Sequence, residues 1–111
     1  MQCIQKGKWL YIPLAGEIDH HRAEAIRTAI DAAFEGNDGR HMLFDFAQVT
    51  FMDSSGIGVI IGRYKNAAKR GGKVAIAAMN ADIARIFHIS GLAKIIDSYP
   101  TVAQAEHALV S

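Results

Sequence analysis

The chain alternates short apolar runs of strand length with longer segments whose apolar residues recur at helical spacing. An apolar run such as residues 41–46 needs cover on both faces, which a parallel sheet flanked by helices provides. After an initial pair of strands, the strand–helix alternation occurs four times with short connections, which favours right-handed crossovers. We therefore predict one α/β domain over residues 1–111, a mainly parallel mixed sheet of about five strands with four helices and an N-terminal hairpin.

Candidate capping residues mark where helices begin and glycines mark where elements end. The predicted strands are residues 2–5, 9–15, 41–46, 73–78 and 94–97. The predicted caps are Asp19, either Asp53 or Ser54, Asn80, and Thr101 paired with Gln104. Pro13 is expected at a strand end or bulge, Gly16 at the end of its strand, and Gly91 as a left-handed helix terminator. The inner face expected for the second helix is Ile57, Ile60, Ile61, Tyr64 and Ala68.

Charge and hydropathy exclude several classes of function. Lysine plus arginine number 12 against 11 aspartate plus glutamate, a formal charge of +1, which gives no reason to propose a nucleic-acid or anionic-membrane binder. The longest apolar run, Val74–Met79, is far short of a membrane span. The single cysteine, Cys3, excludes an internal disulfide and suits a reducing compartment. We expect a cytoplasmic protein.

Conventional catalytic and metal-binding motifs do not occur in the sequence. It has no HExxH and no paired CxxC, and its five histidines are scattered. The glycines at 56, 58 and 62 miss the dinucleotide pattern by one residue, and the serines at 54 and 55 lack the Gly-x-Ser-x-Gly frame of hydrolases. We therefore predict no cofactor, no metal and no enzymatic activity, with a serine-dependent enzyme as the weakest alternative.

The segment Phe51–Gly58 has two interpretations. Asp53 and Ser54 are ordinary helix caps, so capping alone can explain them. Asp53, Ser54 and Ser55 are three candidate caps in a row, however, and one helix start needs only one. In addition, Gly56, Gly58 and Gly62 each destabilise a helix by about 1 kcal/mol relative to alanine. Such a cost suggests that something approaches this backbone closely. A hydroxyl at an exposed helix start is also a suitable place for a phosphate switch.

Three segments carry a family resemblance. Residues 51–65, FMDSSGIGVIIGRYK, closely resemble the phosphorylation-site segment of the sporulation anti-anti-sigma factors, which are single-domain members of the STAS superfamily. Residues 16–21, GEIDHH, resemble their strand-to-helix turn, and residues 85–92, RIFHISGL, their third helix and its exit. The matches extend from about Leu10 to Asp97 in the family's order, and the Asp-Ser-Ser-Gly block is the most specific of them.

The resemblance implies a regulatory function and assigns residues to it. It implies that Ser54 is phosphorylated by an anti-sigma factor that is a serine kinase and uses ATP. It also implies that the unphosphorylated chain binds this anti-sigma factor and so releases a sigma factor for transcription. A serine phosphatase is implied to remove the phosphate. The implied partner-binding residues are Asp19, Asp53, Ser55, Gly56, Ile57 and Gly58. We expect a monomer when free. The alternative is a STAS-type signalling or nucleotide- or phosphate-binding module in another complex.

Overall fold

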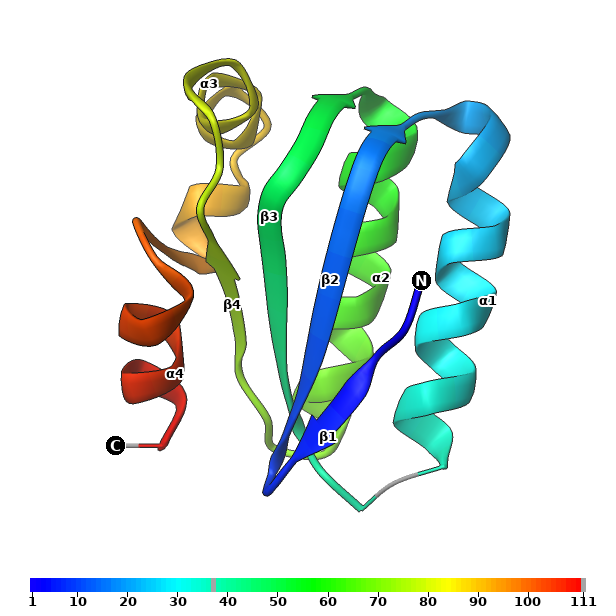
Figure 1. Ribbon diagram of the computed structural model, residues 1–111, viewed down its shortest axis with the longest axis vertical. Helices are drawn as coiled ribbons and strands as arrows, with labels where there is room; N and C mark the ends of the chain where they lie inside the picture. Colours follow the sequence, from blue (N-terminus) through cyan, green and yellow to red (C-terminus); the bar gives the residue numbers. More distant parts are fainter. Residues whose placement is uncertain (37, 111) are drawn as a thin grey trace.

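The computed structural model describes residues 1–36 and 38–110 and is built around a five-stranded mixed sheet (Figure 1). The strands are β1 (Ile4–Lys6), β2 (Trp9–Ile18), β3 (His41–Met52), β4 (Val74–Ala77) and β5 (Asp97–Tyr99). The helices described are α1 (His20–Glu35), α2 (Ser54–Lys69), α3 (Ala81–Ile89), a 3-10 turn η1 (Leu92–Lys94) and α4 (Val102–Val110). Strands lie in chain order, β1 antiparallel to β2 and the others parallel. The predicted fold class is confirmed.

The three helices that connect parallel strands pack on one face of the sheet. In a sheet whose strands follow chain order, crossovers of one hand place their helices on the same side. One hydrophobic cluster accordingly joins α1, α2 and α3 to the inward residues of β2 and β3, and Figure 1 shows α1 and α2 side by side. Its members include Ile30, Phe34, Ile60, Phe87, Ile12, Phe44 and Phe46.

The last helix, α4, covers the opposite face. Ala105 and Leu109 of α4 pack with Trp9, Leu43 and Ala75 of the sheet. Residues 42–44 of β3 are 0 % exposed, because successive side chains point into the two cores in turn. The prediction that this strand is covered on both faces is confirmed.

Local capping chemistry sets the start and end of the helices as predicted. The Asn80 side chain accepts the Ile83 N–H at 2.9 Å, and the Thr101 hydroxyl oxygen accepts the Gln104 N–H at 3.2 Å. Gly91, with φ of +85°, follows the end of α3 in the left-handed conformation that glycine adopts without strain. The caps and this terminator are therefore confirmed.

The prediction that Gly16 ends its strand is wrong. Gly16 adopts a φ of +74° within β2, which continues to Ile18, and β3 runs to Met52 instead of stopping near residue 46. The β2–β3 register shifts twice, between Pro13 and Ala15 and between Gly16 and Glu17. These bulges absorb the two additional residues of β3, so pairing persists beyond the glycine. Pro13 was predicted at a strand end or a bulge, and it lies at the first of these shifts.

The predicted strands at the two ends of the sheet are displaced. Residues 94–97 are not a strand, because η1 ends at Lys94 and the Ile96 N–H donates to the Leu92 carbonyl at 2.9 Å in a turn. Ile96 is buried beneath this turn, and β5 begins only at Asp97. The first strand is likewise residues 4–6 and not 2–5. Apolar content identified core residues here, but not their backbone conformation.

The inner face predicted for α2 is partly wrong. The buried side chains besides Gly56 are Val59, Ile60, Arg63 and Ala67, while Ile57, Ile61 and Tyr64 are half-buried and Ala68 is exposed. The buried stripe is displaced because it includes an arginine, which hydropathy assigns to the surface. Burial lowers the pKa of the Arg63 guanidinium, against the opposing effect of the Asp31 charge.

Arg70, directly after the last residue of α2, has a structural role. Its Nη1 donates to the carbonyls of Phe34 at 2.9 Å and Gly39 at 2.8 Å, and its guanidinium lies 3.8 Å from the centre of the Phe34 ring. Arg70 therefore fastens the end of α2 to the end of α1 and to the segment that leads into β3. A guanidinium suits this position because it donates several hydrogen bonds and stacks on aromatic rings.

Arg63 and Asp31 form an ion pair between α2 and α1, and breaking it should destabilise the fold. Arg63 Nε lies 3.0 Å from Asp31 Oδ1, with the arginine side chain 7 % exposed and the aspartate 31 %. Asp31→Ala leaves a buried cation without its counter-charge, so we expect the free energy of unfolding to fall by about 1–3 kcal/mol in urea denaturation. Arg63→Met, which removes the buried charge but keeps volume, should change it by less than about 1 kcal/mol.

Asp82→Ala provides the matched control. It removes the acid of the Arg85–Asp82 pair, whose side chains are 69 % and 83 % exposed, and should cost no more than about 0.5 kcal/mol. Equal losses from Asp31→Ala and Asp82→Ala would show that the interhelical ion pair has no special weight.

Candidate functional site

The candidate site lies at the carboxyl ends of β2 and β3, where α1 and α2 begin (Figure 1). Ile18 and Met52 are paired across the two strands, so the residues that follow them, Asp19 and Asp53, are brought to the same edge. The Asp53 N–H donates to the Ile18 carbonyl at 3.4 Å, which ties the two strand-to-helix turns together. Parallel pairing thus joins two segments that lie more than thirty residues apart in the sequence.

Both aspartates cap helices with their side chains. Asp19 Oδ1 accepts the N–H groups of His21 and Arg22, each at 3.1 Å, and Asp53 Oδ1 accepts the Ser55 N–H at 2.8 Å. Of the two candidate caps for the second helix, Asp53 is therefore the one used. Each carboxylate accepts N–H groups that the helix itself leaves unpaired, and lies at the positive end of the helix dipole.

Ser54 is the first residue of α2 and is exposed. Its hydroxyl makes no hydrogen bond with any of the residues that the structure describes, because Asp53 supplies the cap. The side chain therefore has no structural task that modification would disturb. Ser54 is accessible, as the predicted phosphorylation site requires.

The predicted partner-binding residues differ in their exposure. Gly58 is exposed and lies one helical turn beyond Ser54, on the same side of α2. Four others are half-buried, namely Asp19, Asp53, Ser55 and Ile57. Gly56 is buried. The exposed surface of this edge therefore centres on Ser54 and Gly58, and a role in partner binding stays a prediction for all six residues.

The three glycines of α2 have different reasons for lacking a side chain. A Cβ on Gly56 would lie 2.4 Å from Met52 Cγ and 3.0 Å from the Ile18 carbonyl oxygen, so the helix start requires glycine to pack on the strand ends. A Cβ on Gly58 or Gly62 would meet nothing within 4 Å. Close packing within the chain therefore explains Gly56 and leaves Gly58 and Gly62 without an internal reason.

Two further residues contribute to this edge that were not predicted from the sequence. Phe51, two residues before the cap, is 47 % exposed, an apolar ring open to solvent beside the site. Arg22 Nη1 donates to the carbonyls of Ala15 at 2.7 Å and Glu17 at 2.6 Å, which braces β2 around Gly16, opposite the bulged part of β3. Phe51 lies within the segment 51–65 that carries the family resemblance. No sequence signal identifies Arg22, because the carbonyls it contacts are brought together only where β2 pairs with the bulged part of β3.

The geometry gives no indication of a metal centre at this edge. Over residues 1–36 and 38–110, no group of three or more histidine, cysteine, aspartate or glutamate side chains is placed to share an ion. Within the same ranges, no helix combines the length and apolar character needed to cross a membrane.

An α/β sheet in chain order with a capped, serine-bearing helix start defines the class. Residues 1–105 match the family model described as the STAS domain, and the chain belongs to this family. Within it, the chain is 38 % identical over 96 residues to an anti-sigma F factor antagonist of Paenibacillus polymyxa, covering 86 % of this chain and 82 % of that protein. It is 37 % identical to an anti-sigma-B factor antagonist of Bacillus subtilis, covering 79 % of each. The family assignment drawn from the sequence is confirmed.

Solved structures agree with this assignment. The anti-sigma factor antagonist SpoIIAA in its unphosphorylated form superimposes with a TM-score of 0.82 at 26 % identity, covering 96 % of this chain and 94 % of that one. The phosphorylated form of the Bacillus protein gives a TM-score of 0.73 at 28 % identity, with 96 % and 97 % covered.

Alanine substitutions at two glycines of α2 should have opposite effects on stability. Gly56→Ala forces a Cβ against Met52 and the Ile18 carbonyl, so we expect the free energy of unfolding to fall by about 1–3 kcal/mol. Gly58→Ala adds a methyl in open space and improves helix propensity, so it should gain up to about 1 kcal/mol. Thermal and urea denaturation of both variants measure the difference. If Gly58→Ala proved as damaging as Gly56→Ala, the packing explanation would fail.

Proposed function

We propose that this chain is an anti-sigma factor antagonist whose binding is controlled by phosphorylation of Ser54. The observation that carries the proposal is the exposed Ser54 hydroxyl at the start of α2, next to an aspartate that already caps the helix. Relatives that bear the antagonist name cover most of the chain. In the unphosphorylated state, the chain binds an anti-sigma factor and so releases a sigma factor for transcription.

Phosphorylation at this position should leave the fold intact. A phosphate adds a charge of about −1.5 to −2, and a helix N-terminus favours an anion. Because the Ser54 hydroxyl has no partner among the described residues, its modification breaks no hydrogen bond that holds α2 in place. The cap formed by Asp53 persists, so the effect of the phosphate is confined to the surface.

The phosphate acts on binding through charge and bulk. Asp53 is adjacent, and two like charges about 5 Å apart repel by about 3 kcal/mol at an effective dielectric of about 20. Water screens this repulsion in the free chain, but a docked partner would displace that water. A loss of about 3 kcal/mol weakens binding about a hundredfold. The switch therefore works by local blocking and needs no refolding.

The surface around Ser54 supports a protein partner. Gly58 and Gly62 follow Ser54 at intervals of four residues along α2 and leave open space where side chains would be, so another backbone can approach this track closely. Phe51 and the half-buried Ile57 offer apolar contacts beside this track. The acids Asp19 and Asp53 lie at the same edge and would give such an interface its polar component.

The resemblance to the sporulation anti-anti-sigma factors supplies the remaining partners of the proposal. The anti-sigma factor is the serine kinase, a serine phosphatase removes the phosphate from Ser54, and the chain itself acts as a cytoplasmic monomer of one domain with no catalytic role. Against a serine-dependent enzyme stands the environment of Ser54. No histidine in the described ranges forms a hydrogen bond with its hydroxyl, as activation of a nucleophile requires.

Substitutions at Ser54 test the proposal directly. Ser54→Ala should stay bound to the anti-sigma factor with or without ATP. Ser54→Asp should bind at least about tenfold more weakly than the unmodified chain. This loss is smaller than the one expected for phosphate, because a carboxylate carries less charge. Titration calorimetry and intact mass after incubation with the anti-sigma factor and ATP measure the two effects. Ser55→Ala is the matched control and should take up one phosphate as the unmodified chain does. Phosphate uptake by Ser54→Ala would refute the site assignment.

A further inference from the structure

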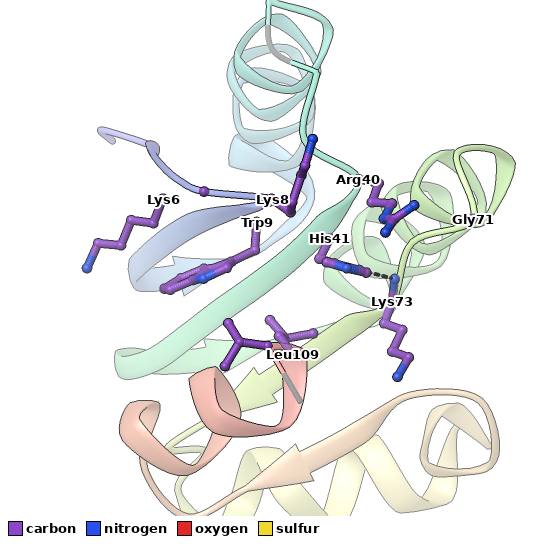
Figure 2. Close-up of a pocket in the computed structure, with 10 residues that line it drawn as sticks. Lys6, Lys8, Trp9, Arg40, His41, Gly71, Lys73 and Leu109 are labelled. Atoms are coloured by element: carbon purple, nitrogen blue, oxygen red, sulfur yellow. Dashed lines mark hydrogen bonds between the residues drawn. The ribbon is translucent and has the colours of Figure 1, made fainter.

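A second concave region lies at the opposite end of the sheet from Ser54. It is a pocket of about 570 Å³ at the amino ends of β2, β3 and β4, closed on one side by the last turn of α4 (Figure 2). Its wall includes Trp9 at the start of β2, His41 at the start of β3 and Leu109 of α4. A pocket of this volume accommodates a small organic molecule.

The pocket gathers positive charge that the whole-chain balance conceals. Four of the 12 lysines and arginines of the chain line it, and no aspartate or glutamate does so among the described residues. The ion pairs found over the described ranges involve Arg27, Arg63 and Arg85. None of them involves the four cationic residues of the pocket. The carboxyl end of α4 itself contributes a partial charge of about −0.5. The four cationic residues are Lys6, Lys8, Arg40 and Lys73.

Backbone hydrogen bonds hold the cationic residues in place. The Lys8 carbonyl accepts the N–H groups of both Arg40 and His41 at 3.0 Å, and the Lys73 carbonyl accepts the Met42 N–H at 3.0 Å. A Cβ on Gly72 would lie 1.6 Å from the Arg40 carbonyl oxygen, so glycine is what allows these two segments to touch. The backbone positions of Lys8, Arg40 and Lys73 are therefore fixed by the fold before any ligand binds. Their charged side chains extend from these positions.

His41 supplies a neutral donor among these cations. Its Nδ1 accepts the Lys73 N–H at 2.9 Å, which leaves the ring proton on Nε2 (Figure 2). Burial, together with the charges of Arg40 and Lys73, lowers the pKa of His41, so the ring is uncharged at neutral pH. Trp9 and Leu109 provide apolar surface next to it. The pocket thus combines several cations, one fixed neutral donor and an apolar wall.

We propose that this pocket binds a small organic molecule that carries two or more phosphate groups. The phosphates contact Lys8, Arg40 and Lys73, and the organic part lies against Trp9 and Leu109. Phosphate fits better than carboxylate, because each phosphate carries up to two negative charges and has enough oxygens to pair with the Arg40 guanidinium and a lysine at the same time. The proposed ligand site is about the length of the sheet away from Ser54 and does not depend on the function proposed for that serine.

Trp9 makes the proposal directly measurable, because it is the only tryptophan of the chain and lines the pocket. Titration of the isolated chain with fructose 1,6-bisphosphate and with inorganic tripolyphosphate, at constant ionic strength, should give a saturable change in its fluorescence. Amide chemical shifts of Lys8, Arg40 and Lys73 provide a second measurement that does not depend on the indole. Citrate, a tricarboxylate, should bind at least about tenfold more weakly, a difference of about 1.4 kcal/mol.

A matched pair of double variants isolates the pocket from overall charge. Lys8→Gln with Lys73→Gln should weaken binding of the bisphosphate about tenfold or more. Lys65→Gln with Lys94→Gln removes the same charge from exposed positions outside the pocket and should leave affinity within about twofold. Melting temperatures of both variants establish that they fold. Equal losses in the two variants, equal affinity for citrate, or no saturable change by either method up to about 10 mM would overturn the proposal.

Discussion

The parallel pairing of β2 with β3 is the constraint on which both regions of interest depend. It runs from Trp9 opposite His41 to Ile18 opposite Met52. One end of this pairing brings the capping aspartates of α1 and α2 to the same edge, and the other end forms the wall of the cationic pocket. The two bulges on the way keep the strands paired although β3 is longer. A shift of this register would alter both ends together.

Local chemistry explains which parts of the fold the sequence predicted correctly. Helix starts at Asp19, Asp53 and Asn80 depend on side chains that accept N–H groups two or three residues away, so the signal and the structure lie in the same short segment. The ends of strands are not set by hydrogen bonds within one short segment, because they depend on the neighbouring strand. Gly16 has the left-handed conformation typical of a strand end, yet β2 continues, because β3 bulges to keep pairing with it.

Long-range contacts account for what the sequence could not predict. Arg63 and Arg70 look like surface residues of α2, but their partners, Asp31 and the Phe34 carbonyl, belong to α1. Hydropathy therefore misplaced the inner face of the helix by treating a buried arginine as solvated. The candidate site shows the same division, since the motif around Ser54 is contiguous and was recognised, whereas the pocket draws on four separate stretches of chain.

The formal charge of +1 shows how a sum over the chain can conceal two regions of opposite character. One end of the sheet carries Asp19, Asp53 and the proposed phosphate, and the other carries four cations. The length of β2, which has ten residues, separates them by roughly 30 Å at about 3.3 Å per residue. Because charges are screened over about 8–10 Å at physiological salt, a phosphate on Ser54 should leave the field at the pocket almost unchanged. Any influence of one region on the other would therefore have to pass through the paired strands themselves.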